Sequence, residues 1–333
     1  GDIDRGGVFA ALAGTMLLLN NREKRRVRGV LINKFRGDLS ILKPGLDDLE
    51  LIISRPVLGV IPFLNIDIED EDSVTERFSA RCQGRGEVHI EVVKLPYISN
   101  FTDFSALARE TGVSLRYVRA GESLDRPDLL IIPGSKSTVS DLLYLRQSGL
   151  EAQILDHYRK GGIVIGICGG YQMLGRRIAD PERSETTLAE VEGLGLLDVE
   201  TIFQAEKITT RVEAEVLPGC SGLLEGLSGT MVEGYEIHQG ISTCGPGARP
   251  ALRLLRGRAG EEQPLEGACN REGTVFGTYI HGIFDNRLFR ESVLNHVRRR
   301  KGLPARRSSA LSYREFKEKE YDRLADHVRR HVD

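Results

Sequence analysis

Apolar and polar residues are distributed along the first part of the chain in blocks that predict helices and strands in alternation. Residues 27–35 hold an apolar, β-branched run that ends at Asn33, which is typical of a buried parallel strand. The pattern also predicts helices at 8–19 and 41–53, a strand at 56–62, and an opening strand that ends near Ile3. Such alternation indicates the rear part of a doubly wound α/β domain.

A second series follows a polar, glycine-rich stretch at residues 79–87, which we interpret as the domain boundary. The later pattern predicts strands at 88–93, 115–118, 129–132, 162–167, 232–237 and 275–279, and helices at 104–111, 139–146 and 289–300. We therefore expect two doubly wound α/β domains. They comprise the C-terminal part of one domain at 1–80 and a second domain at 88–290, followed by a helical tail at 291–333.

Composition narrows the class of protein. The 333 residues contain 46 Lys+Arg and 48 Asp+Glu, so the net charge of −2 argues against a general nucleic-acid binder. With 40% hydrophobic and 28% charged residues, the chain is typical of a globular protein rather than a disordered one. No apolar stretch approaches the roughly 20 residues that a membrane span requires. The chain opens on Gly1 without a methionine, so we expect a fragment.

The cysteines point to reactivity rather than to cross-linking. There are five, none in a CxxC pair, at positions 82, 168, 220, 244 and 269. Because the count is odd and the spacing is irregular, we expect no disulfide framework and no zinc site, and we expect a reducing cytoplasm. One of the five can then be a reactive thiol.

Cys168 is the strongest candidate for that thiol. An apolar strand runs into Gly166-Ile167-Cys168-Gly169-Gly170, and a helical pattern follows. This is the layout of a nucleophile elbow, in which glycines permit a sharp turn with the side chain at its tip. The start of the following helix favours the thiolate form. A buried structural cysteine at a strand end is the alternative.

A thiolate that attacks an amide needs a base and an oxyanion hole. His281 follows the strand predicted at 275–279, and ligands meet an α/β sheet at such strand ends. We therefore predict His281 as the base, with a structural histidine as the alternative. Backbone N–H groups of Gly169 and of the loop that contains Gly134 are the expected oxyanion donors. That loop is no phosphate loop, because G-x-x-x-x-G-K-[ST] occurs nowhere in the chain.

These residues resemble the class I, triad-type glutamine amidotransferase domain, in which G-x-C-x-G-x-Q carries the nucleophile. The resemblance implies that Cys168 forms a glutamyl thioester and releases ammonia, and that Gln172 helps bind the substrate glutamine. Members of that class carry His-x-Glu, whereas the second residue after His281 is Ile283. The acid that orients the histidine is therefore missing or comes from elsewhere in the chain.

A closer resemblance, to the cobyric acid synthase family, covers almost the whole chain. It rests on these segments: D-I-D-R-G-G-V-F-A at 2–10, I-N-K-F-R-G-D at 32–38, V-L-G-V-I-P-F at 57–63, E-D-E-D-S at 69–73, N-F-T-D-F at 100–104, P-G-S-K-S-T at 133–138, I-C-G-G-Y-Q-M-L-G at 167–175, G-Y-E-I-H at 234–238 and T-Y-I-H-G-I-F-D-N at 278–286. The resemblance implies ATP-, Mg²⁺- and glutamine-dependent amidation of the b, d, e and g carboxylates of adenosylcobyrinic acid a,c-diamide, a corrinoid. ATP would activate each carboxylate as an acyl phosphate, which ammonia would then attack.

The resemblance also suggests roles for residues outside the elbow. The family's ATP-using half resembles dethiobiotin synthetase, and its P-loop is expected upstream of residue 2. Asp2 and Asp4 are then candidates for the Mg²⁺ or phosphate site, or simply cap a turn. Asn33 resembles the family's adenine-contacting residue, or forms a turn.

Two further groups are left open between a site and a structural role. The acidic residues 69–72 line a corrin or metal site, or form a solvated loop. Glu236 and His238 lie near the glutamine site, or serve the structure only.

Three rival functions remain. Cobyrinic acid a,c-diamide synthase shares both domains, but the segments at 5–7 and 100–103 favour cobyric acid synthase. A non-catalytic partner module is disfavoured by the presence of Cys168, Gln172 and His281. A simple cysteine hydrolase is disfavoured by the synthetase-like half. The oligomeric state is not predicted.

Overall fold

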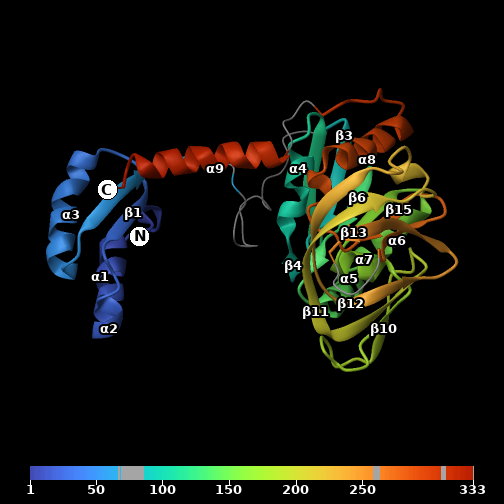
Figure 1. Cartoon of the computed structure of the whole chain (residues 1–333), viewed down its shortest axis with the longest axis horizontal. Helices are drawn as coiled ribbons and strands as arrows, with labels where there is room; N and C mark the ends of the chain where they lie inside the picture. Colours follow the sequence, from blue (N-terminus) through green and yellow to red (C-terminus); the bar gives the residue numbers. More distant parts are fainter. Residues whose placement is uncertain (67, 69–85, 258–262, 309–312, 333) are drawn as a thin grey trace. The chain divides into compact units, whose positions relative to one another are not determined.

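The computed structural model describes residues 1–66, 68, 86–257, 263–308 and 313–332 (Figure 1). The chain divides into two compact units, one of Gly1–Glu69 with Arg314–Asp333 and one of Asp70–Tyr313. The acidic segment 69–72 and residues 79–85 of the expected linker lie outside the described residues. Within the described residues, no helix combines the length and apolar character needed to cross a membrane.

The first unit is built on a short parallel sheet. Its elements are η1 (Ile3–Arg5), α1 (Val8–Leu18), α2 (Asn21–Lys24), β1 (Val30–Phe35), α3 (Leu39–Ile53), β2 (Val57–Pro62) and α9 (Tyr313–Arg329). Strands β1 and β2 pair in parallel. These two strands, with α1 and α3, confirm the strands and helices predicted between residues 8 and 62. The opening strand expected to end near Ile3 corresponds to a parallel bridge between Asp2 and Asn33, beside which the Asn33 N–H donates to the Gly1 carbonyl oxygen at 2.7 Å. From Ile3 the chain forms a 3₁₀ helix capped by Asp2.

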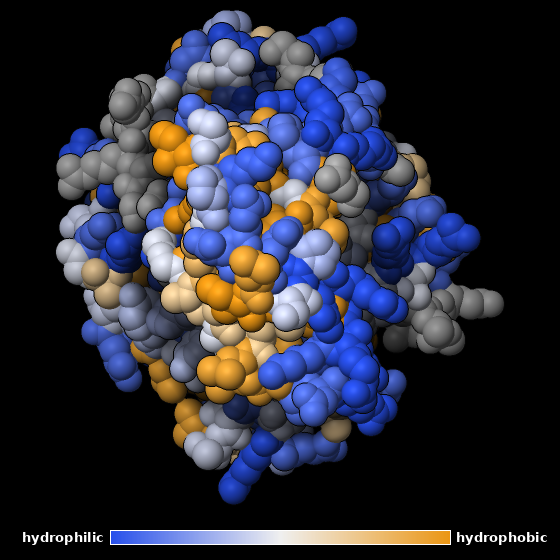
Figure 2. All heavy atoms as spheres, turned by 90° about the vertical axis from the view of Figure 1, so that its left-hand side faces the viewer, coloured by the Kyte–Doolittle hydropathy of each residue, from blue (hydrophilic) through white to orange (hydrophobic). Residues whose placement is uncertain are grey.

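The core of this unit is small. It contains Met16, Val30, Leu49 and Ile53. Large apolar side chains of α1 and α3 stay exposed beside it, among them Leu18 at 87% and Ile41 at 81%. Figure 2 shows such apolar surface on the face of the molecule turned to the viewer.

Helix α9 belongs to the first unit through contacts at its C-terminal end. The backbone at Val332 bridges to Gly59, and a Cβ atom on Gly59 would lie 2.0 Å from the His331 carbonyl oxygen. In addition, His327 Nε2 lies 2.8 Å from the Pro62 carbonyl oxygen. The tail therefore reaches the edge of β2, and only a glycine at position 59 permits this approach.

The second unit is organised around one large mixed sheet. The strand order is β10-β9-β11-β13-β14-β15-β8-β6-β3-β5, and β12 pairs with β11. The strands are β3 (Val88–Val93), β5 (Val113–Val118), β6 (Leu129–Ile132), β8 (Ile163–Ile167), β9 (Arg177–Ala179), β10 (Glu190–Glu192), β11 (Val199–Val216), β12 (Met231–Cys244), β13 (Ala248–Arg256), β14 (Leu265–Asn270) and β15 (Val275–Thr278). A separate pair joins β4 (Ile98–Ser99) to β7 (Gly134–Ser135).

Five neighbouring strands, β5, β3, β6, β8 and β15, are all parallel. Four of them, β3, β6, β8 and β15, are buried throughout. Strands β6 and β8 read as continuous apolar runs, which is why the sequence predicts them well, whereas β3 also buries His89 and Glu91. From β15 outward the sheet continues through antiparallel pairs to β14, β13, β11 and β12. The fold class is therefore α/β, with an antiparallel extension that the sequence pattern showed only in part, at 232–237.

Helices connect and cover the parallel strands. They are η3 (Phe101–Phe104), α4 (Ser105–Ala108), α5 (Thr138–Gln147), α6 (Leu150–Arg159), α7 (Gly169–Leu174), η4 (Gly222–Leu224), η5 (Ile283–Asp285) and α8 (Arg287–Arg300). The helix predicted at 104–111 is shorter than expected and is a single turn preceded by η3. Strand order reverses between β3 and β6, and in open α/β sheets ligands bind beyond the carboxyl ends of strands at such a reversal.

One expectation about the cysteines was wrong. Cys220 and Cys269 form a disulfide across 49 positions, joining the loop before η4 to β14. The Cα atoms lie 6.1 Å apart, within the range for such bonds. Sequence spacing could not show this pair, because the strands that bring the two residues together belong to the antiparallel extension. Cys168 and Cys244 are free.

Candidate active site

Cys168 occupies a strained turn between β8 and α7. Its φ of 52° and ψ of −110° lie outside the regions that most L-residues adopt, and the side chain is buried. Its N–H group donates to the Thr278 carbonyl oxygen at 2.8 Å, so the turn is tied to the end of β15. The structure thus places the predicted elbow directly beside the strand that leads to His281.

His281 is completely buried, and both of its ring nitrogens have protein partners. Nδ1 lies 2.7 Å from Oδ2 of Asp103, and Nε2 lies 3.0 Å from the Asn100 side-chain amide. The Asp103 carboxylate is itself buried, and its Oδ1 accepts a hydrogen bond from the Gly282 N–H at 2.9 Å. The acid that the sequence left unassigned is therefore close to the histidine, on the 3₁₀ helix η3.

The electrostatics of this cluster favour a protonated imidazole. Burial by itself lowers the pKa of His281, but the Asp103 carboxylate and the hydrogen-bonded Cys168 side chain outweigh it and raise the pKa to about 10. A raised imidazole pKa next to a thiol favours transfer of the thiol proton to the ring. The arrangement thus supports a thiolate–imidazolium pair.

The two predicted oxyanion loops meet at this cluster. A Cβ atom on Gly134 would lie 3.1 Å from His281 Cε1, and one on Gly169 would lie 3.0 Å from the Ser135 backbone nitrogen. The pairing of β7 with β4 fixes the backbone of Gly134 opposite Ser99. Both glycines therefore border the space around the Cys168 and His281 side chains, and neither could carry a larger residue without displacing a neighbour.

Gln172 is buried and its amide is fully engaged with protein groups. Its Nε2 donates to the Gln239 carbonyl oxygen at 2.8 Å and to the Tyr279 hydroxyl at 3.1 Å. Its Oε1 accepts from the Thr138 hydroxyl at 3.0 Å. In this structure the side chain joins α7 to β12, to α5 and to Tyr279 just after β15, and so holds the elbow in place.

Strand β12 passes alongside the nucleophile. The Ile237 carbonyl oxygen lies 3.6 Å from Cys168 Sγ, and the Tyr235 ring stacks on the His281 ring with centroids 5.2 Å apart. The neighbouring Glu236 and His238 are both buried, with His238 Nε2 3.9 Å from the Glu236 carboxylate. The structure thus brings these two residues to the strand that borders the site, whereas the sequence left their position open.

The candidate nucleotide and metal residues lie in the first unit. Asp2 forms ion pairs with Lys34 at 2.8 Å and with Arg5 at 3.8 Å, and Asp4 pairs with Arg36 at 3.3 Å. Lys34 lowers the pKa of the Asp2 carboxyl. In this structure both carboxylates pair with exposed cations, and no reaction step is assigned to a Mg²⁺ ion.

The structure adds two observations on the metal and nucleotide candidates. Within the described ranges, no group of three or more His, Cys, Asp or Glu side chains is arranged to hold a metal ion. Asn33 is exposed on β1, where its side-chain oxygen accepts from the Lys34 N–H at 2.9 Å. That contact is compatible with both roles considered for Asn33.

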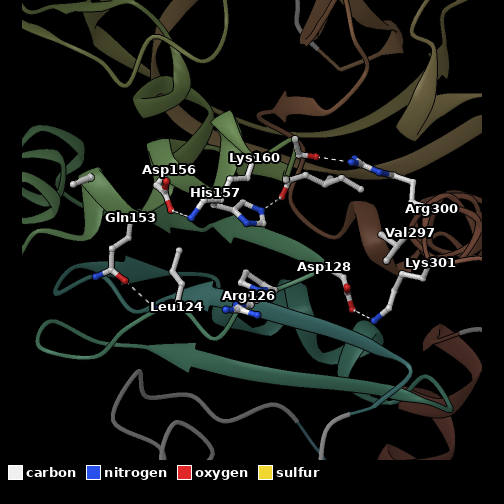
Figure 3. Close-up of a pocket in the computed structure, with 15 residues that line it drawn as sticks. Leu124, Arg126, Asp128, Gln153, Asp156, His157, Lys160, Val297, Arg300 and Lys301 are labelled. Carbon is white, nitrogen blue, oxygen red and sulfur yellow. Dashed lines mark hydrogen bonds and ion pairs between the residues drawn. The ribbon is translucent and has the colours of Figure 1, made fainter.

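A separate pocket of about 850 Å³ opens at the opposite end of the parallel strands, where β6 and β8 begin (Figure 3). It is lined by residues that precede β6 and β8 and by the ends of α6 and α8. Ion pairs border it, between Lys301 and Asp128 and between Lys160 and Asp156, each at 2.6 Å. Its lining contains none of the residues of the Cys168 cluster.

The sequence reasoning missed Asp103 and Asn100 as site residues. In the sequence, residues 100–104 stand out only through the family resemblance. Nothing in the local pattern shows that these side chains contact His281, because 178 positions separate Asp103 from it. Two sequence features together could have indicated these residues. Position 283 carries Ile instead of an acid, and a segment that contains Asn100 and Asp103 follows a buried parallel strand.

A buried cysteine at a strand-to-helix turn, a histidine at the end of the adjacent strand and a carboxylate on that histidine resemble the arrangement of cysteine-nucleophile α/β enzymes with a Cys-His-acid triad. Similarity to known proteins identifies the family within this class. The CobB/CobQ-like glutamine amidotransferase domain matches residues 89–289. The chain belongs to this family.

Curated relatives extend the similarity to the whole chain. A cobyric acid synthase of Clostridium botulinum (strain ATCC 19397 / Type A) is 52% identical over 333 residues, and one of Thermoanaerobacter sp. (strain X514) is 50% identical over 334. Each match covers all of this chain and 65% of the relative, so the chain spans about two thirds of their length. Among solved structures, a chain of PurLQS from Thermotoga maritima aligns with 63% of this chain and 99% of its own, at 20% identity and a TM-score of 0.47.

Proposed function

We propose that this chain hydrolyses glutamine at Cys168 and supplies the ammonia for an ATP-dependent amidation of corrinoid carboxylates. The observation that carries the first part is the cluster of Cys168, His281 and Asp103 in a member of the amidotransferase family. The second part rests on the name of the relatives, cobyric acid synthase, and on their similarity over the whole chain.

The geometry of the cluster supports the following glutaminase step. The Cys168 thiolate attacks the side-chain amide carbon of glutamine, and the carbonyl oxygen becomes an oxyanion that the N–H groups of Gly169 and Gly134 are proposed to stabilise. The protonated His281 gives its proton to the amide nitrogen, the C–N bond breaks, and ammonia leaves. A glutamyl thioester remains on the sulfur.

The second half of the cycle restores the enzyme. His281, now neutral, takes a proton from a water molecule as that water attacks the thioester carbon. The C–S bond breaks, glutamate leaves, and the sulfur regains the thiolate form beside the protonated ring. Gln172 keeps the elbow in position through its bonds to β12, to Tyr279 after β15 and to α5.

The proposed acceptor is adenosylcobyrinic acid a,c-diamide, amidated at its b, d, e and g carboxylates to give adenosylcobyric acid. Amidation of the a and c carboxylates by a related synthase is the alternative for this step. Product analysis with each corrinoid, on a protein of the relatives' full length, distinguishes the two. Four added amides support the first proposal, and two added amides support the alternative.

The glutaminase proposal is tested by the release of glutamate from glutamine. The matched pair is Cys168→Ala and Cys244→Ala, because Cys168 and Cys244 are the two free cysteines among the described residues. We expect Cys168→Ala to lose activity by roughly 10³-fold or more and Cys244→Ala to retain it. Wild-type turnover in Cys168→Ala would overturn the proposal.

A further inference from the structure

One short segment holds both nitrogens of the His281 ring. Asp103 contacts Nδ1 at 2.7 Å and Asn100 contacts Nε2 at 3.0 Å, and the two residues are only three positions apart. A carboxylate accepts hydrogen bonds and cannot donate them, so Nδ1 carries a hydrogen and donates to Asp103. This fixes the tautomer in which Nε2 is the nitrogen that exchanges protons with the nucleophile.

Asp103 is itself held in one orientation. Its Oδ2 faces His281 and its Oδ1 accepts from Gly282, so two consecutive residues after β15 are bound by one carboxylate. Ile283, which stands where triad-type amidotransferases carry the acid, is buried in η5 instead. The carboxylate beside the base thus comes from η3, which follows β4, rather than from the segment after the histidine.

Asn100 supplies a partner that suits both states of the ring. In the neutral ring Nε2 has a lone pair, to which the Asn100 amide donates. In the protonated ring Nε2 carries a hydrogen, which the Asn100 carbonyl oxygen can accept after the amide turns over. The backbone of Asn100 has a φ of 48°, a left-handed conformation that Asn tolerates better than most residues. The segment can therefore follow the proton without moving its backbone.

The segment is anchored independently of His281. Strand β4 pairs with β7, which places Ser99 opposite Gly134, and the Asp103 N–H donates to the Asn100 carbonyl oxygen at 3.0 Å. Phe104 is buried, and its ring lies 6.4 Å from that of Phe284. The loop that borders the oxyanion site and the two partners of the base are thus parts of one rigid assembly.

We infer that Asn100 and Asp103 are the positioning residues of the base: Asp103 takes the place of the missing triad acid, and Asn100 holds the proton-exchanging nitrogen. This inference rests on the proposed glutaminase activity. The titratable groups that face the ring are Asp103 from η3, Cys168 from the elbow and Tyr235 from β12. Among them, Asp103 is the only carboxylate in hydrogen-bonding contact with the ring within the described residues.

The test measures glutaminase kcat and KM across a range of pH. Asp103→Asn keeps the size of the side chain but presents an amide to Nδ1. We expect kcat to fall by about 10²- to 10⁴-fold, with KM little changed. Loss of the carboxylate also lowers the pKa of His281, so the alkaline limb of the kcat profile should move to lower pH. Asp103→Glu, which retains a carboxylate, should keep that limb near its wild-type position.

The remaining variants separate the possible outcomes. Asn100→Gly removes the amide and still permits the left-handed backbone, and we expect kcat to fall by about tenfold. Asp156→Asn is the matched control, an exposed carboxylate beside the separate pocket, and should behave as the wild type. Wild-type kcat and pH profile in Asp103→Asn, with Cys168→Ala inactive, would overturn the role of Asp103 and leave the glutaminase proposal standing. Wild-type kcat in Asn100→Gly would overturn the role of Asn100.

Discussion

Gly170 contacts the backbone of Ile132 so closely that a Cβ atom at position 170 would lie 2.0 Å from the Ile132 carbonyl oxygen. Ile132 ends β6, and Gly170 stands two residues after the nucleophile on α7. The contact brings the elbow against the neighbouring strand and explains the second glycine of the Cys-Gly-Gly motif. The obstacle is backbone rather than a flexible side chain, so it cannot move aside easily.

This contact predicts the effect of adding one methyl group. Gly170→Ala should lower the free energy of unfolding of the second unit by about 1–3 kcal/mol and reduce glutaminase activity, because the elbow must shift away from β6. Chemical denaturation and the glutamate-release assay measure both effects. The control is Gly14→Ala in α1 of the first unit, where the added Cβ meets no neighbour within 4 Å. This change should leave glutaminase activity unchanged and should not lower the free energy of unfolding. Wild-type unfolding free energy and wild-type activity in Gly170→Ala would contradict this explanation of the second glycine.

The role of Gln172 can be separated from substrate binding. Gln172→Glu replaces the donor that faces the Gln239 carbonyl oxygen with a second acceptor in a buried site. We expect a loss of about 1–3 kcal/mol in unfolding free energy together with a fall in kcat. If the residue only bound glutamine, KM would rise and the unfolding midpoint would stay at the wild-type value, which would contradict the positioning role.

Much of this arrangement could be predicted from sequence, for identifiable reasons. The strands at Leu129–Ile132 and Ile163–Ile167 are buried on both faces and are therefore continuous apolar runs. Strand β11 mixes exposed charged residues with buried ones over 18 positions, and no such run marks it. The position of Cys168 followed from local chemistry, since glycines on both sides of one cysteine after a strand indicate an elbow.

The interactions that the sequence could not supply are those between distant segments. Asp103 reaches His281 across 178 positions, and Cys220 reaches Cys269 across 49. Both pairs depend on how strands are ordered in the sheet, which a local pattern does not encode. For the same reason, the full engagement of the Gln172 amide was visible only in the structure.

Glu185 provides a test of pH dependence. Its carboxylate accepts from the Val139 N–H at the start of α5, and burial raises its pKa from 4.5 to about 6, with smaller contributions from other groups. Its contribution to stability is therefore fully present below about pH 4.5 and is lost as the pH rises through about 6. Glu185→Gln keeps an acceptor for that N–H and should match the wild type in melting temperature at pH 4. Above pH 6 the variant should melt higher, and an equal difference at both pH values would contradict this explanation.

The disulfide makes a prediction about stability under reduction. Closing a loop of 49 positions restricts the unfolded chain, which by loop entropy alone corresponds to about 4 kcal/mol. Cys220→Ser with Cys269→Ser should therefore lower the unfolding midpoint, and a reducing agent should lower that of the wild type but not of the variant. Peptide mapping without reduction should recover the two cysteines in one linked fragment. Recovery of separate, alkylated peptides would show that the bond does not form in solution.

The central claim is that Cys168 carries a glutamyl group during turnover, and this intermediate can be observed directly. Protein mixed with glutamine and quenched in acid is digested, and the masses of its peptides are compared with those of Cys168→Ala. The account predicts a glutamyl adduct on the wild-type peptide that contains Cys168 and no adduct in the variant. Glutamate production by the wild type with the adduct on another residue, or an adduct that persists in Cys168→Ala, would contradict it.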